Sequence, residues 1–211
     1  MPTHRLWAFE RGALWVMDLR ASPATRAAAS TAIQYSEADA GAITALALAM
    51  EVESGEVARR LAGGSRCFLA RTVAGEIVGY GWVSHGSERI GELERTLRMK
   101  PDEAYVWDCA THAPYRRSGV YTALLTFITG TLRNEVLSRV WIGASLGNYP
   151  SLKGFVNAGF QPALTIYYLR LGSVSRSWLL PAPGVAPTLF ASARWALTQE
   201  RGRMDGSVAH G

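Results

Sequence analysis

The 211-residue chain contains only two cysteines, Cys67 and Cys109. Neither belongs to a C-x-x-C pair or to a Cys/His group with metal-ligand spacing. The sequence therefore argues against a disulfide framework and a zinc site, and we expect no bound metal. Both cysteines fall in apolar, strand-like runs, which indicates small core residues in a reducing compartment. We accordingly expect a cytoplasmic protein.

Long apolar segments are also missing. The longest, residues 40–50, falls well short of the ~20 residues that a membrane-spanning helix needs. Residues 1–5 lack the apolar stretch that opens a secretory signal. The sequence predicts no membrane partner.

The common phosphate-binding motifs do not occur. There is no G-x-x-x-x-G-K-[ST] segment and no G-x-G-x-x-G after a predicted strand, so P-loop and Rossmann-type dinucleotide sites lose their main support. Lys and Arg number 22 against 17 Asp and Glu, a formal net charge of +5. This balance suits an anionic ligand, but the basic residues are scattered and form no arginine-rich stripe, so we expect no nucleic-acid partner.

What the chain does contain is enough apolar material for a core, since 48% of its residues are hydrophobic and 18% are charged. Hydrophobic patterning separates the chain into strands and helices. A short turn at 74–76 predicts a hairpin, and residues 92–99 fit either a strand or a helical turn. The strands are expected at 13–19, 32–35, 67–73, 77–83, 104–110, 139–144 and 164–171, and the helices at 36–50, 54–61, 118–136, 150–158 and 187–199.

Residues 115–121 lie between a predicted strand and the long amphipathic helix. The first amides of that helix have no acceptor within it and favour an anion. Arg116, Arg117 and Ser118 add charge and hydrogen bonds, and Gly119 lets an oxygen approach the backbone. We expect a site of the size of a pyrophosphate. The alternative is that Ser118 and Gly119 only cap the helix.

Arg116, Gly119 and Tyr121 can be compared with a known signature. Residues 116–121, Arg-Arg-Ser-Gly-Val-Tyr, resemble the [QR]-x-x-G-x-[GA] motif of the GCN5-related N-acetyltransferases, the GNAT superfamily. Arg116 and Gly119 match this motif, and Tyr121 departs from it. Two such motifs in the right order are much harder to obtain by chance than one. The second is 148–160, which is similar to the later N-x-x-[AS]…G-F segment of the family.

The resemblance covers about residues 31–171 and implies an α/β (α+β) fold. It predicts a mixed, largely antiparallel sheet of six to seven strands that is flanked by helices and splayed at its fourth and fifth strands. Residues 29–171 would be the acetyltransferase domain. Residues 1–28 would be an accessory N-terminal strand and linker, and 172–211 a C-terminal extension with one helix and a flexible tail. These segments could cover an acceptor pocket or form a homodimer contact, and both alternatives stay open.

The resemblance also implies acetyl-CoA as the acyl donor. The backbone near the end of the fourth strand would bind the pantetheine arm and polarise the thioester, the 116–121 loop would hold the diphosphate, and two residues of the later segment would contact the pantetheine or the sulfur. The cofactor-binding residues assigned in this way are Ala110, Thr111, Arg116, Arg117, Ser118, Gly119, Val120, Tyr121, Asn148 and Ser151.

The usual general base is replaced in this sequence, because Trp107 stands where many family members have a glutamate. Asp108 is the candidate base. Strand alternation would point its side chain to the face opposite Trp107, unless a bulge near Cys109 resets the register. His112, in the loop after the strand, could instead shuttle a proton.

The usual general acid is also replaced. The tyrosine that reprotonates the departing thiolate in the family corresponds to Phe155 here. Tyr149 is the candidate acid, and Tyr121 and Tyr105 are alternatives to it.

The resulting hypothesis is an acyl-CoA-dependent N-acyltransferase that transfers acetyl from acetyl-CoA to a primary amine. The acceptor could be a small molecule, a sugar or a peptide. The alternative is a catalytically inactive coenzyme A-binding sensor or partner-binding module of the same fold, which the residues Trp107 and Phe155 favour.

Overall fold

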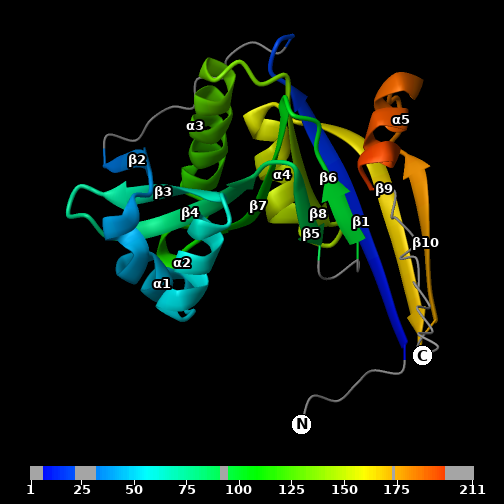
Figure 1. Cartoon of the computed structure of the whole chain (residues 1–211). Coiled ribbons are helices and arrows are strands. Elements are labelled where there is room, and N and C mark those ends of the chain that lie inside the picture. The colour runs from blue at the N-terminus through cyan, green and yellow to red at the C-terminus, as the bar shows by residue number, and fades with distance from the viewer. Residues whose placement is uncertain (1–6, 22–31, 91–94, 173, 198–211) are drawn as a thin grey trace, which may run out of the picture.

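The computed structural model describes residues 7–21, 32–90, 95–172 and 174–197. Eight strands form one sheet in the order β10-β9-β1-β8-β7-β4-β3-β2, and β5 and β6 form a separate two-stranded sheet (Figure 1). Neighbouring strands are antiparallel, except for the parallel pair β7 and β8. The strands are β1 (Trp7–Asp18), β2 (Ile33–Glu37), β3 (Arg66–Thr72), β4 (Ile77–Ser84), β5 (Ser87–Ile90), β6 (Arg95–Arg98), β7 (Glu103–Thr111), β8 (Arg139–Ser145), β9 (Gln161–Leu171) and β10 (Val174–Pro181).

Helices cover both faces of the sheet. On one face, α3 and α4 pack against a core drawn from β1, β3, β4, β7 and β8. On the other face, α1 and α2 cover β3 and β4, while α5 covers β1, β8 and β9. The helices are α1 (Ile43–Met50), α2 (Ser54–Ala62), α3 (Val120–Asn134), α4 (Tyr149–Ala158) and α5 (Pro187–Ala196). The cavity of the candidate site is on this second face and is lined by residues of β1, β5, β7, β8 and β9.

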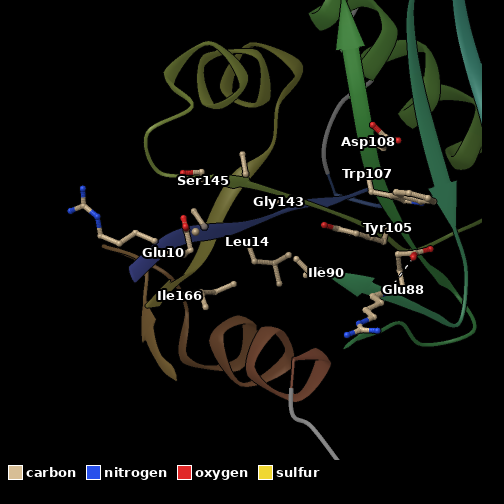
Figure 2. Close-up of a pocket in the computed structure, with 15 residues that line it drawn as sticks. Glu10, Leu14, Glu88, Ile90, Tyr105, Trp107, Asp108, Gly143, Ser145 and Ile166 are labelled. Atoms are coloured by element: carbon tan, nitrogen blue, oxygen red, sulfur yellow. Dashed lines mark hydrogen bonds between the residues drawn. The ribbon is translucent and has the colours of Figure 1, made fainter. Parts of the chain in front are cut away.

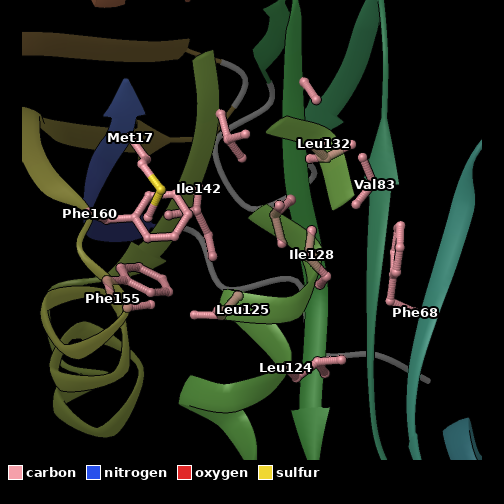
Figure 3. Packing of buried hydrophobic residues seen from close by; sticks show 14 of the residues in the cluster. Met17, Phe68, Val83, Leu124, Leu125, Ile128, Leu132, Ile142, Phe155 and Phe160 are labelled. Atoms are coloured by element: carbon pink, nitrogen blue, oxygen red, sulfur yellow. The ribbon is translucent and has the colours of Figure 1, made fainter. Parts of the chain in front are cut away.

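The long helix α3 follows directly from its apolar spacing. Leu124, Leu125, Ile128 and Leu132 recur at intervals of one, three and four residues and are all 0% exposed. Figure 3 shows these side chains between the sheet and Phe155 of α4. Burial of each such side chain contributes roughly 1.5–3 kcal/mol to folding, so this layer fixes the position of the loop that precedes α3.

The N-terminal strand β1 lies inside the sheet. It pairs with β8 over residues 12–18 and with β9 over residues 7–16. Leu14 and Val16 are therefore buried, with exposed fractions of 1% and 0%. The strand predicted at 13–19 exists, but it begins earlier and is a central strand; residues 22–28, also placed in the accessory segment, lie outside the described residues.

The sheet has eight strands rather than the predicted six to seven. The additional strand β10 pairs with β9 over eight positions, from Val174 with Leu171 to Pro181 with Leu164. It is an edge strand with mostly exposed side chains, so it lacks the apolar alternation that identifies a strand in the sequence.

One helix starts later than predicted, and the structure decides one alternative that the sequence leaves open. The helix expected at 36–50 starts only at Ile43, because Ser36 pairs with β3 and Asp39 is the residue that caps the preceding 3-10 turn. The segment 92–99 contains strand β6. The last helix begins at Pro187 as expected; its predicted end at 199 and the tail at 201–211 lie outside the described residues. Within the described ranges, no helix has the length and apolar character needed to cross a membrane.

Candidate functional site

Strands β7 and β8 are paired at one end and separate at the other. They pair only from Glu103 with Arg139 to Val106 with Ile142. Beyond these residues β7 continues along β4 and β8 continues along β1. At the paired end the buried carboxylate of Glu103 accepts hydrogen bonds from Arg139 (2.9 Å) and from Trp141 Nε1 (3.0 Å). β7 and β8 are the strands expected at 104–110 and 139–144, which correspond to the fourth and fifth strands of the family's sheet. The predicted splay between them is present, because only one end of the pair is hydrogen-bonded.

A cavity of about 560 Å³ lies where the strands separate. It is lined by β1, β5, β7, β8 and β9, on the face of the sheet that carries α2 and α5. Apolar Leu14, Ile90 and Ile166 and the rings of Tyr105 and Trp107 form much of its wall (Figure 2). This volume is in the range of small-molecule sites.

A β-bulge turns Asp108 into this cavity. Tyr80 pairs with Ala110 but Trp82 pairs with Trp107, so β7 has one residue more than β4 across this interval. Asp108 has φ +41°, in the left-handed region. The bulge condition attached to the prediction for Asp108 is thus met, and its carboxylate shares the cavity with Trp107.

The same bulge moves Cys109 to the α3 face. A Cβ at Gly81 would lie only 2.8 Å from the Cys109 sulfur, so a glycine is needed on the neighbouring strand. Burial raises the pKa of the Cys109 thiol well above its usual value. The sulfur therefore stays protonated and is no nucleophile at neutral pH.

Arg60 of α2 holds the Asp108 carboxylate. Its NH1 lies 2.5 Å from Asp108 Oδ2, and its Nε lies 2.8 Å from Glu56 Oε1. The guanidinium stacks over the rings of Trp107, at 4.7 Å from the centroid, and Trp82, at 5.1 Å. With a side chain only 15% exposed, Arg60 is fixed from four sides and in turn fixes Asp108.

A second carboxylate in the cavity, Glu88 of β5, has no signal in the sequence. Ser84 donates a hydrogen bond to Glu88 Oε2 (2.6 Å) and accepts one from Trp107 Nε1 (2.8 Å). Ser84 is 4% exposed and also lies 3.0 Å from the Ser65 hydroxyl. Because β5 is four residues long and half exposed, neither its pattern nor a motif marks Glu88 as part of a site.

The loop before α3 has the backbone conformation of an anion site. Arg117 and Gly119 have φ values of +65° and +84°, and a Cβ at Gly119 would meet nothing within 4 Å. Ala123 N donates to Gly119 O (3.0 Å), so the amides of residues 120–122 precede the first helical donor. Successive N–H groups in such a turn form an anion-binding concavity.

Two side chains of this loop are used to shape it. Arg116 Nε donates to the Thr111 carbonyl (3.1 Å), and the Ser118 hydroxyl donates to the Tyr115 carbonyl (2.5 Å). The hydroxyl of Thr111 is itself buried without a partner among the described residues. A phosphorylated ligand could accept hydrogen bonds from the backbone amides and from the exposed arginines. The unsatisfied hydroxyl of Thr111 could pair with an amide group in the same ligand.

Tyr121 fills the space between α3 and α4. Its ring lies where a Cβ at Gly154 would be, and Ser151 hydrogen-bonds to its hydroxyl. Burial raises the pKa of Tyr121 well above its usual value, and the Ser151 hydrogen bond opposes this shift only in part. The departure from the small residue of the motif is therefore accommodated by a glycine on the facing helix.

The remaining predicted residues lie at the start of α4 and after β7. Asn148 caps α4 by accepting from the Ser151 amide (3.3 Å), and Tyr149, the first residue of that helix, is 75% exposed. Phe155 is 1% exposed and packs against neighbouring aromatic rings. His112 Nε2 lies 3.1 Å from the Ala49 carbonyl. Tyr149 has no contact that supports an acid role, which stays a prediction.

The predicted residues thus form two groups on either side of the strand separation. The loop residues 116–121 and the start of α4 lie on the α3 face, while Asp108 lies in the cavity on the other face. Over the described residues there is no group of three or more His, Cys, Asp or Glu side chains that could hold a metal ion. The arrangement combines a loop with free backbone amides on one face with a cavity that contains carboxylates on the other.

Solved structures share this fold. A GCN5-related N-acetyltransferase from Sphaerobacter thermophilus superposes with a TM-score of 0.59 at 13% identity, over 84% of this chain and 54% of that one. A tandem GNAT protein from the clavulanic acid biosynthesis pathway gives 0.57 at 16% identity, over 80% and 55%. A GNAT-family acetyltransferase from Colwellia psychrerythraea gives 0.55 at 13% identity, over 82% and 57%. The chain therefore spans a little over half the length of these proteins.

The sequence comparison identifies the family itself. No curated protein matches the chain. The family model described as acetyltransferase (GNAT) family matches residues 50–160, which run from the end of α1 through the splayed strands and the loop before α3 to the end of α4. Both motifs and the separating strands β7 and β8 fall within this match. The chain belongs to the GNAT acetyltransferase family.

Proposed function

We propose that this protein transfers an acetyl group from acetyl-CoA to a primary amine that binds in the cavity beside Asp108. The observation that carries the proposal is the separation of β7 from β8, which joins the anion-binding loop on one face to the cavity on the other. A thioester lying in this gap would have its diphosphate on the loop and its acyl carbon next to the cavity.

The donor would be held mainly by backbone groups. The amides of residues 117–121 would bind the diphosphate, with Arg116 and Arg117 adding positive charge. The unpartnered Thr111 hydroxyl and the backbone at Ala110 would pair with the pantetheine arm and the thioester carbonyl. Asn148 and Ser151, at the start of α4, would lie along the same arm.

The chemical step is a direct displacement. The neutral amine nitrogen forms a bond to the acyl carbon, the carbon–sulfur bond breaks, and coenzyme A leaves as the thiolate. The acylated nitrogen then loses its second proton, which returns to the tyrosine that has protonated the thiolate. An alkylammonium with a pKa of roughly 10 must first lose a proton, and we assign the acceptance of that proton to Asp108, which lines the cavity. Arg60 NH1 lies 2.5 Å from Asp108 Oδ2 and orients the carboxylate beside the cavity.

The thiolate must then be protonated. Tyr149 is the proposed donor, although its side chain is exposed at the start of α4. Tyr121 is the alternative, since it lies between α3 and α4 and bonds to Ser151. Activity of Tyr149→Phe and Tyr121→Phe variants distinguishes the two, because only loss of the true donor lowers the rate of thiol release.

The test of the function is the release of free thiol from acetyl-CoA in the presence of a panel of primary amines. Turnover with any of these amines, together with detection of the acetylated amine, supports the enzyme. Tight binding of acetyl-CoA without turnover of any amine would contradict it and favour the alternative, a coenzyme A-binding sensor. Trp107 and Phe155, at the positions of the usual base and acid, are the residues that favour this alternative.

A further inference from the structure

We propose that the acceptor carries a second ammonium group and that Glu88 binds it. This inference rests on the proposed function and names the substrate class of the same site: a short linear diamine, whose first nitrogen reacts at the strand separation and whose second nitrogen pairs with Glu88. Glu88 is then a specificity-determining residue rather than a base.

Glu88 lies in the same cavity as Asp108. Both Glu88 and Asp108 line the cavity, one from β5 and the other from the bulge in β7. In Figure 2, the side chains of Trp107 and Tyr105 lie between the two carboxylates. A molecule that reaches both must therefore extend along an aromatic wall, which suits a chain of methylene groups with a cation at each end.

Two hydrogen bonds hold the Glu88 carboxylate in a fixed orientation. The Ser84 hydroxyl donates to Oε2 at 2.6 Å, and the Arg89 amide donates to Oε1 at 3.1 Å. Ser84 is 4% exposed and is oriented by Trp107 Nε1. A carboxylate held in this way binds a cation without first losing side-chain freedom.

The carboxylates in the cavity differ in whether they have an ion-pair partner. Asp108 already has Arg60 as an ion-pair partner at 2.5 Å. For Glu88, no arginine or lysine in the part of the chain that the structure describes lies within ion-pair distance, and the same holds for Glu10, an exposed carboxylate that lines the cavity from β1. The exposed Arg11 and Arg89 also line the cavity and form no such pair with Glu88. A partly buried carboxylate without a counterion favours a cationic ligand.

Another part of the cavity wall is apolar. Leu14, Ile90 and Ile166 are apolar and line the same cavity. They would contact the methylene groups of the acceptor and offer no hydrogen bonds to a polyhydroxylated chain. A small alkyl diamine therefore fits the cavity better than a sugar.

The experiment compares 1,4-diaminobutane with n-butylamine, which has the same carbon chain and lacks the second nitrogen. We expect kcat/KM to favour the diamine by at least about tenfold, the effect of one partly buried ion pair. Glu88→Gln should remove most of this preference by raising KM for the diamine far more than KM for n-butylamine. Glu53→Gln, which makes the same charge change at an exposed position outside the cavity, should keep the preference.

Equal kcat/KM for the two amines, or a preference that survives Glu88→Gln, would overturn the role of Glu88 and leave the proposed function intact. Turnover of other amines but of neither of these two would do the same. Absence of turnover with every amine would overturn the proposed function and this inference together.

A second variant tests whether the orientation of Glu88 matters. Ser84→Ala keeps the carboxylate but removes the hydroxyl that holds it, so we expect a smaller rise in KM for the diamine, of about threefold. The melting temperature of each variant is measured alongside. A diamine KM that does not change in a folded Ser84→Ala protein would contradict the fixed orientation of the carboxylate.

Discussion

Single residues decide which groups face the cavity. Strand alternation places Asp108 opposite Trp107, and one additional residue in β7 reverses this. Gly81 leaves space for the Cys109 side chain that the bulge displaces. At a separate place, between α3 and α4, Gly154 leaves space for the Tyr121 ring. The chemistry of the site therefore depends on residues that do not themselves react.

Replacement of Asp108 by Asn tests its role as a base. The amide keeps the shape of the side chain but cannot accept the proton, so we expect kcat to fall by about 10²-fold or more. The affinity for coenzyme A, measured by calorimetry, should change little because the loop 116–121 lies on the other face of the sheet. Equal rates of the variant and the wild type at several pH values would remove Asp108 from the mechanism.

Gly154 and Gly130 form a matched pair for the packing of Tyr121. A methyl group at Gly154 would collide with the Tyr121 ring, whereas one at Gly130, within α3, would meet nothing within 4 Å. We expect Gly154→Ala to lower the free energy of unfolding by about 1–3 kcal/mol. Gly130→Ala should raise it by up to about 1 kcal/mol through helix propensity. Urea unfolding curves measure both, and similar effects of the two substitutions would contradict the close approach of Tyr121 to α4.

Among the elements, β1 connects the N-terminus to the site. It pairs on both sides, with β8 and β9, and so holds β8 away from the free end of β7. Residues 10–14 of this strand also line the cavity. An N-terminal segment that the sequence marks as accessory is thus part of the wall of the candidate acceptor site.

The stability of β1 can be tested with two substitutions on the same strand. Val16 is fully buried and Phe9 is 48% exposed. We expect Val16→Ala to lower the free energy of unfolding by about 1–3 kcal/mol, and Phe9→Ala to lower it by about 1 kcal/mol or less because its ring stays in contact with water in the folded protein. A small effect of Val16→Ala in urea unfolding would contradict the central position of β1.

The elements also show how far the sequence could predict this protein. The hairpin, the long helix and the strand pairs around it follow from apolar spacing, because each element buries one continuous face. The place of β1 in the sheet does not follow, since pairing partners are chosen by long-range packing. Glu88 was missed for a related reason: its role depends on contacts with Ser84 and Trp107 that only the folded chain brings together.

For the whole molecule, burial of weak acids predicts a loss of stability at high pH. Burial raises the pKa of the Cys67 thiol from 9.0 to about 12 and that of Tyr80 from 10.0 to about 12. Well below pH 9 both groups are protonated in the folded and the unfolded chain. As the pH rises from 9 toward 12, only the unfolded chain releases these protons, so unfolding is increasingly favoured.

The measurement is the free energy of unfolding in urea between pH 8 and pH 11. We expect it to decrease with pH, with each such group contributing at most about 1.4 kcal/mol per pH unit. Cys67→Ala should be less stable at pH 8 but should have a shallower dependence on pH. A slope that the substitution leaves unchanged would show that the thiol ionises equally in both states.

The proposed acetyl transfer requires that the loop before α3 binds the diphosphate of acetyl-CoA. Calorimetric titration of coenzyme A into the wild type, Gly119→Ala and Gly119→Asp tests this most directly. Alanine at Gly119 meets only the strain of its φ of +84°, since no atom lies within 4 Å of its Cβ, whereas aspartate also brings a negative charge to the site. We predict that the wild type binds coenzyme A, that Gly119→Ala binds it a few-fold more weakly, and that Gly119→Asp loses at least about tenfold more affinity than Gly119→Ala. Equal affinities of the two variants, or no heat of binding to the wild type, would contradict the central claim.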